Sequence, residues 1–440
     1  MSWSIIFVGC RFATLERIAV SIAVVSLIAL VVVIVVSCVN QKLNPGLLAL
    51  SAALLIGFFY GGMTEGAIVD FFPSRLFVMI VAMSLVFGSA HSNGTLEKIT
   101  QRAIYLIKGQ RVLLPILIFV FAFMLSAIGP GNIITTAVLA PLAMLLAKKH
   151  KVSEILIGIM LCTGANAGAL SPFAPTGVIL IGLLEKISLS TSLIWVVFLV
   201  AAVLQSISAF SAYFIFLIRT KRRGVSLLSN KNEQFEIQVD PFTVQQKITV
   251  ALIGLLLAGV LIAKLPLTVM AVFVAVLLFV FRVADEETVI KLVPWSTIIM
   301  VSGIAILISL MEKTGGLTLA TDFIVSVTSS GSINAVLAFV TGLVSAYSSS
   351  SGVVMPAFIP LLPGLAAKMN ITDIVPLVIA VAVGSHMVDV SPLSTLGALT
   401  IAAIEDKETR NRTFKYLMVW GMSMSIVGGI LAFVFLDVLR

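Results

Sequence analysis

Two short segments of the sequence collect the side chains with the greatest capacity for chemistry. Residues 164–177 and 384–397 each combine glycine, small hydroxyl side chains and proline inside a long apolar run. The second segment also carries Asp389, and His386 lies three residues earlier on the same face of a helix. Proline removes an amide donor and clashes with the preceding turn, so each segment is predicted to interrupt a helix and to free backbone carbonyls. Carbonyl, Ser, Thr and Asn oxygens suit a small hard cation such as sodium.

The ionisable groups of the second segment are candidates for function, because an ionisable side chain inside a membrane is costly. Two interpretations stay open for Asp389. It is either a cation ligand or proton carrier, or a structural partner of His386 or of freed amides. His386 is either the second group of a proton relay or an ordinary hydrogen-bonded residue of the helix.

Two further segments divide apolar stretches into halves. Gly129-Pro130-Gly131-Asn132 separates residues 112–128 from 133–147, and Ser348-Ser349-Ser350-Ser351-Gly352 divides a second stretch. Each half is short for a span, and such clusters are strong turn signals. We therefore predict re-entrant hairpins over 112–149 and 332–369, with tips that are buried in protein or water at mid-membrane. The tip residues are candidates for binding, although turn formation alone would also explain their types.

The helix halves after the breaks and the second hairpin arms are predicted to point their N-termini at one depth. These ends carry partial positive charge and free amides, which suit a carboxylate. No Lys or Arg falls in these elements near the predicted midplane. The candidate substrate-binding residues are Asn132, Ser350, Ser351, Ser171, Ser394 and Thr395. The candidate ion-coupling residues are Gly131, Asn132, Asn166, Ser349, Gly384, Asp389 and Ser391, which would hold sodium as the only metal. No cofactor is predicted apart from a coupling sodium ion or proton.

The elements that must position these residues are membrane helices. The chain of 440 residues is 60% hydrophobic and 11% charged, which leaves too little polar surface for a water-soluble globule. Its apolar runs reach the length of about 20 residues that a transmembrane helix needs. We predict an all-α, multi-pass protein of the cell (plasma or inner) membrane, with the lipid bilayer as its surroundings. Besides the hairpins, the predicted helices are 18–40, 46–62, 75–92, 152–186, 190–218, 248–263, 265–281, 296–311, 373–405 and 415–437.

The sequence also contains an internal repeat, with five such helices, one of them broken, and a hairpin in each copy. Lys42-Leu43 recurs 222 residues later, and Gly164 and Ser171-Pro172 recur 220 residues later. Repeat 1 spans 1–218 with a broken helix at 152–186, residues 219–247 form a cytoplasmic linker, and repeat 2 spans 248–440 with a broken helix at 373–405. An odd number of crossings per copy requires an inverted second copy. This arrangement puts both termini outside and most of the 28 Lys and Arg residues on the cytoplasmic side. Discontinuous helices paired across inverted repeats indicate a transport site.

Composition argues against several other classes of protein. The net charge of +8 is spread over short tracts between apolar runs, which argues against nucleic acid as a partner. Cys10, Cys38 and Cys162 lack the spacing of metal ligands. No segment resembles a nucleotide-binding loop, which argues against an ATP-driven pump. A membrane-embedded enzyme would need a nucleophile with its base, or a metal cluster, so we predict that the protein is not an enzyme.

The order of hairpin, broken helix, linker, hairpin and broken helix resembles the ion transporter superfamily, which includes the divalent anion/sodium symporters. Residues 164–177, 348–364 and 384–398 look most like its dicarboxylate (malonate-type) carrier branch. In the symporters each hairpin tip carries Ser-Asn-Thr, which binds substrate carboxylate and sodium. Gly131-Asn132-Ile133 retains only the Asn, and Ser350-Ser351-Gly352 retains only the first Ser. The resemblance implies an elevator mechanism and a homodimer.

These observations predict a secondary active transporter of a small carboxylate, a dicarboxylate in the first place, coupled to sodium or protons by alternating access. The alternative is a sodium/proton antiporter of the same superfamily, in which Asp389 exchanges the two ions. An organic anion is the expected partner in the first case, and only cations are expected in the second.

Overall fold

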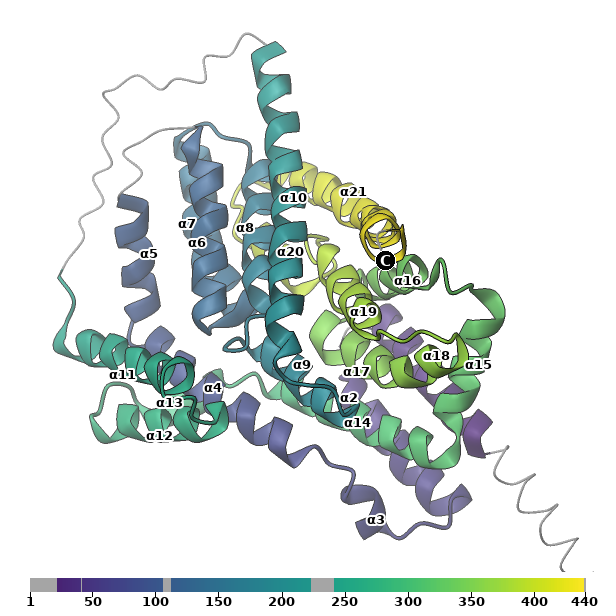
Figure 1. Cartoon of the computed structure of the whole chain (residues 1–440). Helices are drawn as coiled ribbons and strands as arrows, with labels where there is room; N and C mark the ends of the chain where they lie inside the picture. The colour runs from purple at the N-terminus through teal and green to yellow at the C-terminus, as the bar shows by residue number, and fades with distance from the viewer. Residues whose placement is uncertain (1–21, 41, 106–111, 223–240, 439–440) are drawn as a thin grey trace, which may run out of the picture.

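The computed structural model describes residues 22–40, 42–105, 112–222 and 241–438. These ranges consist of helices and loops, with no β-strand among them (Figure 1). Eight helices in the same ranges are long and apolar enough to cross a membrane. The architecture is that of an all-helical, polytopic membrane protein.

The described residues of the first half form ten elements. The described part of the first helix is Ile22–Val39. The following elements are α2 (Pro45–Leu55) with a π-helical end (Ile56–Tyr60), α3 (Glu65–Val69), α4 (Ser74–Ser92), α5 (Thr95–Tyr105), α6 (Leu113–Ile128), α7 (Gly131–Lys149), α8 (Glu154–Ala169), α9 (Pro175–Lys186) and α10 (Leu193–Arg222).

The described residues of the second half also form ten elements, and the predicted repeat stays a prediction. This half contains α11 (Val244–Leu261), α12 (Leu267–Val280), α13 (Glu286–Leu292), α14 (Trp295–Thr314), α15 (Gly316–Val327), α16 (Ile333–Ser345), a helical run from Ser350 to Lys368, α19 (Val375–Met387), α20 (Thr395–Ala402) and α21 (Lys407–Ala432) with a π-helical end (Phe433–Val438). The short helices α3 and α13, and the helix α15, were not predicted. The inverted orientation of the halves stays a prediction.

The second arm of the second hairpin differs from that of the first. Residues 350–368 pass from a π-helical turn (Ser350–Val354) through α17 (Met355–Phe358) and a 3-10 turn (Ile359–Leu361) to α18 (Leu362–Lys368). Prolines at 356, 360 and 363 explain the changes, since each removes an amide donor from the helix. In the first hairpin the second arm, α7, is one helix of 19 residues.

Three predicted boundaries and one predicted length are wrong. The last helix begins at Lys407 and not at 415, because Asp406 caps it by accepting from the amide of Thr409 at 2.8 Å. The predicted helix 190–218 continues to Arg222 as α10, and the predicted helix 248–263 begins at Val244 as α11. Residues 223–240 lie outside the described ranges, and the linker between the halves stays a prediction. The arm α7 is roughly 28 Å long at 1.5 Å per residue, so it is not short for a span.

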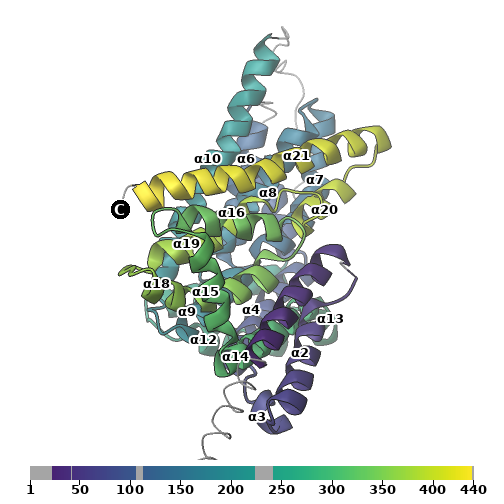
Figure 2. The same cartoon turned by 90° about the vertical axis from the view of Figure 1, so that its right-hand side faces the viewer.

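Two groups of helices surround the predicted hairpins and breaks. In Figures 1 and 2, α2 and α14 lie together at the lower part of the molecule, where Gly46 and Gly303 let their backbones touch. The helix α4 packs against α12 nearby. The hairpin arm α6 packs on α8, α16 packs on α19, and α10 and α21 cover the broken helices from outside.

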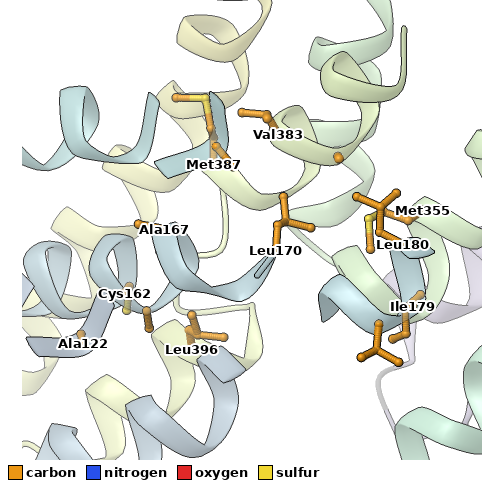
Figure 3. Close-up of a cluster of buried hydrophobic side chains, with 14 of the residues drawn as sticks. Ala122, Cys162, Ala167, Leu170, Ile179, Leu180, Met355, Val383, Met387 and Leu396 are labelled. Carbon is orange, nitrogen blue, oxygen red and sulfur yellow. The ribbon is translucent and has the colours of Figure 1, made fainter. Parts of the chain in front are cut away.

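A buried apolar cluster surrounds both breaks (Figure 3). Its labelled side chains come from α6, α8, α9, α17, α19 and α20, and Leu170 belongs to the first break itself. Close packing of this kind fixes the positions of the breaks, since interiors tolerate few voids.

Candidate functional site

The two helix breaks share one backbone geometry. The amide of Ser171 donates to the carbonyl of Gly168 at 3.1 Å, and the amide of Ser391 donates to that of Val388 at 2.8 Å. In each break the amide three residues further on then donates to the serine carbonyl, at 3.0 and 2.9 Å. Each donor and acceptor of the second pair lies 220 residues after its counterpart in the first pair.

The helices resume after the breaks for local reasons. Pro175 is the first residue of α9, where its missing amide costs nothing. Ser394 caps α20 by accepting from the amide of Gly397 at 3.4 Å. A Cβ at Gly397 would lie 2.1 Å from the carbonyl oxygen of Ser391, and one at Gly177 would lie 1.9 Å from that of Ser171. Only glycine fits where each chain folds back on its own break.

The first hairpin tip is built from left-handed glycines. Gly129 has φ +152° and Gly131 has φ +73°, conformations that residues with a side chain rarely adopt. A Cβ at Gly131 would also lie 2.8 Å from Cδ of Pro175, so the tip touches the start of α9. This turn places Asn132 one residue inside the N-terminus of α7.

The second tip is built from serines. Ser349 accepts from the amide of Gly352 at 3.0 Å and so caps the helical run that begins at Ser350. Ser348 contacts the first helix, where its Oγ lies 3.0 Å from Oγ of Ser37. A Cβ at Gly352 would collide with Met300 of α14, so this tip also lies against α14.

Both tips and the second break meet at one small polar cavity. Three helical runs begin at it, namely α7, the run from Ser350 and α20, and α19 ends at it. The lining residues are Asn132, Ile133, Ser348, Ser349, Ser350, Ser351, His386, Asp389, Ser394, Thr395 and Leu396, and none of these is Lys or Arg. The cavity measures about 20 Å³. That volume holds roughly one water molecule, which needs about 10–15 Å³.

Asp389 is hydrogen-bonded by neutral donors from both halves of the chain. Ser350 donates to its Oδ1 at 2.7 Å, and Asn166 approaches its Oδ2 through Nδ2 at 3.4 Å. Oγ of Ser345 lies 2.7 Å from Oγ of Ser350. Because Ser350 gives its one proton to Asp389, Ser345 is the donor in that contact. The side chain of Asp389 is 5% exposed.

Amide side chains connect the two breaks. Asn132 donates through Nδ2 to Oδ1 of Asn166 at 2.8 Å, and Asn166 donates through Nδ2 to the carbonyl of His386 at 2.9 Å. Gln205 of α10 donates through Nε2 to the same carbonyl at 3.1 Å. The first hairpin tip, both breaks and α10 therefore belong to one buried polar network.

His386 is held by its own helix. Its Nδ1 lies 2.6 Å from the carbonyl oxygen of Ala382, so Nδ1 carries the hydrogen and Nε2 is an acceptor. Asp389 accepts from Ser350 and Asn166 instead, so among the described residues the predicted structural pairing with His386 does not form.

Several candidate residues from the sequence lie away from the cavity. Ser171 donates to the carbonyl of Ala127 at 2.7 Å, and Ser391 donates to Sδ of Met418 at 3.8 Å. Gly384 packs against the backbone of Ala338 in α16. Gly131 forms the turn beside Asn132 without lining the cavity. The candidates that do line it are Asn132, Ser349, Ser350, Ser351, His386, Asp389, Ser394 and Thr395, with Asn166 directly behind them.

Sequence reasoning missed two members of the network. Gln205 is a lone amide inside the apolar span Leu193–Ile218, and a polar residue at that depth is itself a signal. Ser345 left no signal, because it ends an ordinary apolar helix and gains its role only through the fold.

The fold and the cavity define a class of protein: a helical, membrane-spanning carrier with a polar site between discontinuous helices. Residues 20–169 match the family model "Dicarboxylate carrier protein MatC N-terminus". The resemblance to the malonate-type dicarboxylate carriers is confirmed over this part of the chain, which holds the first hairpin and the helix before the first break. No curated protein matches the chain. The family match and the membrane architecture support a transporter for dicarboxylate and favour a transporter over an enzyme.

Proposed function

We propose that the chain is a secondary active transporter that moves a small dicarboxylate across the cell membrane together with a cation, sodium or proton. The observation that carries the proposal is the cavity at which three helical runs begin and no cationic side chain lies. Helix N-termini attract carboxylates through free amides and partial positive charge. The family match supports the dicarboxylate as the cargo.

The charge at the cavity favours a co-transported cation. Three N-termini contribute roughly +0.5 charge each and the C-terminal end of α19 about −0.5, which leaves roughly +1 at the cavity. A dicarboxylate with an ionised Asp389 would bring three negative charges to the same place. A bound cation or proton would reduce this imbalance, so substrate and cation stabilise each other's binding.

The cavity is too small for a dicarboxylate, which favours a mechanism in which the elements around the site move. At about 20 Å³ it holds roughly one water molecule, and a dicarboxylate needs the tips to separate. In the proposed elevator mechanism, hairpins and broken helices slide as one body against α2, α4, α12 and α14. Polar contacts cross this boundary between Arg75 and Glu185 at 3.0 Å, and between Lys186 and Ser309 at 2.8 Å. The inverted repeats and a homodimer of the fixed helices belong to the same proposal.

Uptake into proteoliposomes tests the proposal. Purified protein is expected to accumulate labelled malonate or succinate when a sodium or proton gradient is imposed, and to exchange external label for unlabelled dicarboxylate inside. Liposomes without protein are the control. Absence of both accumulation and exchange for every small dicarboxylate tested would contradict the proposal.

The alternative, a sodium/proton antiporter, is favoured by one observation: Asp389 is the only carboxylate among the residues that line the cavity. Antiport would move protons when sodium is added without any organic anion. A pH-sensitive dye in inverted vesicles detects that movement.

A further inference from the structure

Three backbone carbonyls of the second break already accept hydrogen bonds. The His386 carbonyl accepts from Asn166 and Gln205, and the Val388 carbonyl accepts from the amide of Ser391 at 2.8 Å. The Asp389 carbonyl accepts from Oγ of Ser394. Hard cations are surrounded by about six or more oxygen ligands. These three carbonyls already accept hydrogen bonds and are therefore poorer sodium ligands than free carbonyls would be.

Two acceptors at the cavity have room for a proton. Oδ1 of Asp389 takes a full hydrogen bond from Ser350, but Oδ2 has only the 3.4 Å approach of Asn166. Nε2 of His386 has no hydrogen-bond partner within the described residues, although the side chain is 1% exposed and lines the same cavity. A buried acceptor without a donor costs about 1–3 kcal/mol. A proton added at the cavity would supply the donor that Oδ2 of Asp389 and Nε2 of His386 lack.

The groups that face Asp389 from each neighbouring element are otherwise neutral. The hairpins contribute Asn132, Ser345, Ser350 and Ser351; α8 contributes Asn166 and Cys162; α10 contributes Gln205; α19 contributes His386; and α20 with its cap contributes Ser394 and Thr395. Cys162 is the other titratable group nearby, and its Sγ lies 3.2 Å from Oγ1 of Thr400. No lysine or arginine in this set balances an ionised Asp389 beside a bound dianion.

We infer that the coupling ion is a proton, carried on Oδ2 of Asp389 and hydrogen-bonded to Nε2 of His386 through one water molecule in the cavity. The inference rests on the proposed function and specifies its coupling ion. Water on the side to which the site opens gives up the proton, which forms the O–H bond at Oδ2. On the other side that bond breaks and the proton returns to water. The protonated site brings two negative charges to the cavity with a bound dicarboxylate, and not three.

Uptake by proteoliposomes, first without sodium and then with a sodium gradient, distinguishes proton coupling from sodium coupling. With the membrane potential held at zero, an inward gradient of one pH unit is expected to drive up to about tenfold accumulation of labelled malonate at one proton per substrate. A sodium gradient at equal pH is expected to drive none. Purified protein in weak buffer is expected to take up about one proton per malonate bound, as reported by a pH indicator.

The Asp389→Asn variant keeps the size of the side chain but cannot gain the proton, so it is expected to lose accumulation driven by pH. Asp70→Asn, at an exposed carboxylate at the end of α3, is the matched control and is expected to behave as the natural protein. Accumulation that follows sodium and ignores pH overturns the inference and leaves the proposed function intact. Accumulation driven by pH in Asp389→Asn also overturns it. If the natural protein shows no dicarboxylate exchange at all, the proposed function is overturned, and the inference with it. The measurements on the natural protein decide the matter even if Asp389→Asn does not fold.

Discussion

Asn166 donates a hydrogen bond to the carbonyl oxygen of His386 at 2.9 Å, and the two residues are 220 positions apart, the shift at which the halves of the sequence match. Equivalent positions of the two breaks are therefore in direct contact. Asn166 also receives the hydrogen bond of Asn132 from the first hairpin tip. One fully buried side chain thus joins a tip and both breaks.

Replacement of Asn166 by leucine is expected to destabilise the protein more than replacement of Gln205. Asn166→Leu leaves Nδ2 of Asn132 without its acceptor, at a cost of about 1–3 kcal/mol. Gln205→Leu leaves the His386 carbonyl still bonded to Asn166. Thermal unfolding of both variants in detergent compares the two effects, and equal stability losses would contradict the central place of Asn166.

Ser350→Ala is expected to weaken substrate binding and not the fold. The change removes a hydroxyl that lines the cavity and would donate to a substrate carboxylate, and a hydrogen bond to a charged group contributes about 1.5–3 kcal/mol. We expect the KM for malonate to rise by roughly tenfold to hundredfold. Ser326→Ala, on the exposed part of α15, is the control. An unchanged KM would remove Ser350 from the site.

Gly177→Ala and Gly397→Ala are each expected to abolish transport and to lower stability. Their new Cβ atoms would lie 1.9 and 2.1 Å from backbone oxygens of the breaks, so the breaks would have to open. Gly254→Ala in α11 meets no atom within 4 Å and is expected to stabilise its helix by about 0.5–1 kcal/mol. Folded yield and malonate exchange of the three variants provide the comparison. Normal exchange in Gly397→Ala would show that this break is not closely packed during transport.

The start of α21 is expected to lose order only in strong acid. The amide and hydroxyl of Thr409 hold the pKa of Asp406 below its ordinary value. The ionised cap therefore contributes stability above the unfolded pKa of about 3.9, and this contribution is lost as the pH falls through the lower folded pKa. Hydrogen exchange of residues 407–412, corrected for intrinsic rates, measures it. Asp406→Asn retains a capping oxygen without the charge and is expected to remove this pH dependence.

The sequence pattern predicted most elements because long apolar runs indicate membrane helices, and proline and glycine within such runs indicate breaks. Asn132, Ser350 and Asp389 were found because they stand at such interruptions. Ser171 and Ser391 occupy equivalent interruptions, yet their hydroxyls turn to Ala127 and Met418. The direction in which a break turns its side chains depends on packing against neighbouring helices, which periodicity does not contain. The start of α21 was missed because its first two turns are charged, and a cap rather than apolar length defines them.

The prolines of the second hairpin make the arm behind its tip easier to bend than the arm behind the first tip. The first tip is attached to α7, which stays a single helix around one internal proline, Pro141, whereas the second is attached to an arm with prolines at 356, 360 and 363. Each proline lacks a backbone N–H, and fewer backbone hydrogen bonds lower the free energy that local opening requires. The second arm therefore bends at lower cost than the first. Ser350 is the first residue of that arm, so bending of the arm would move its hydroxyl away from Asp389. A gate at this position would open the site from one side only, and departure of Ser350 would expose Asp389 to solvent in the same movement.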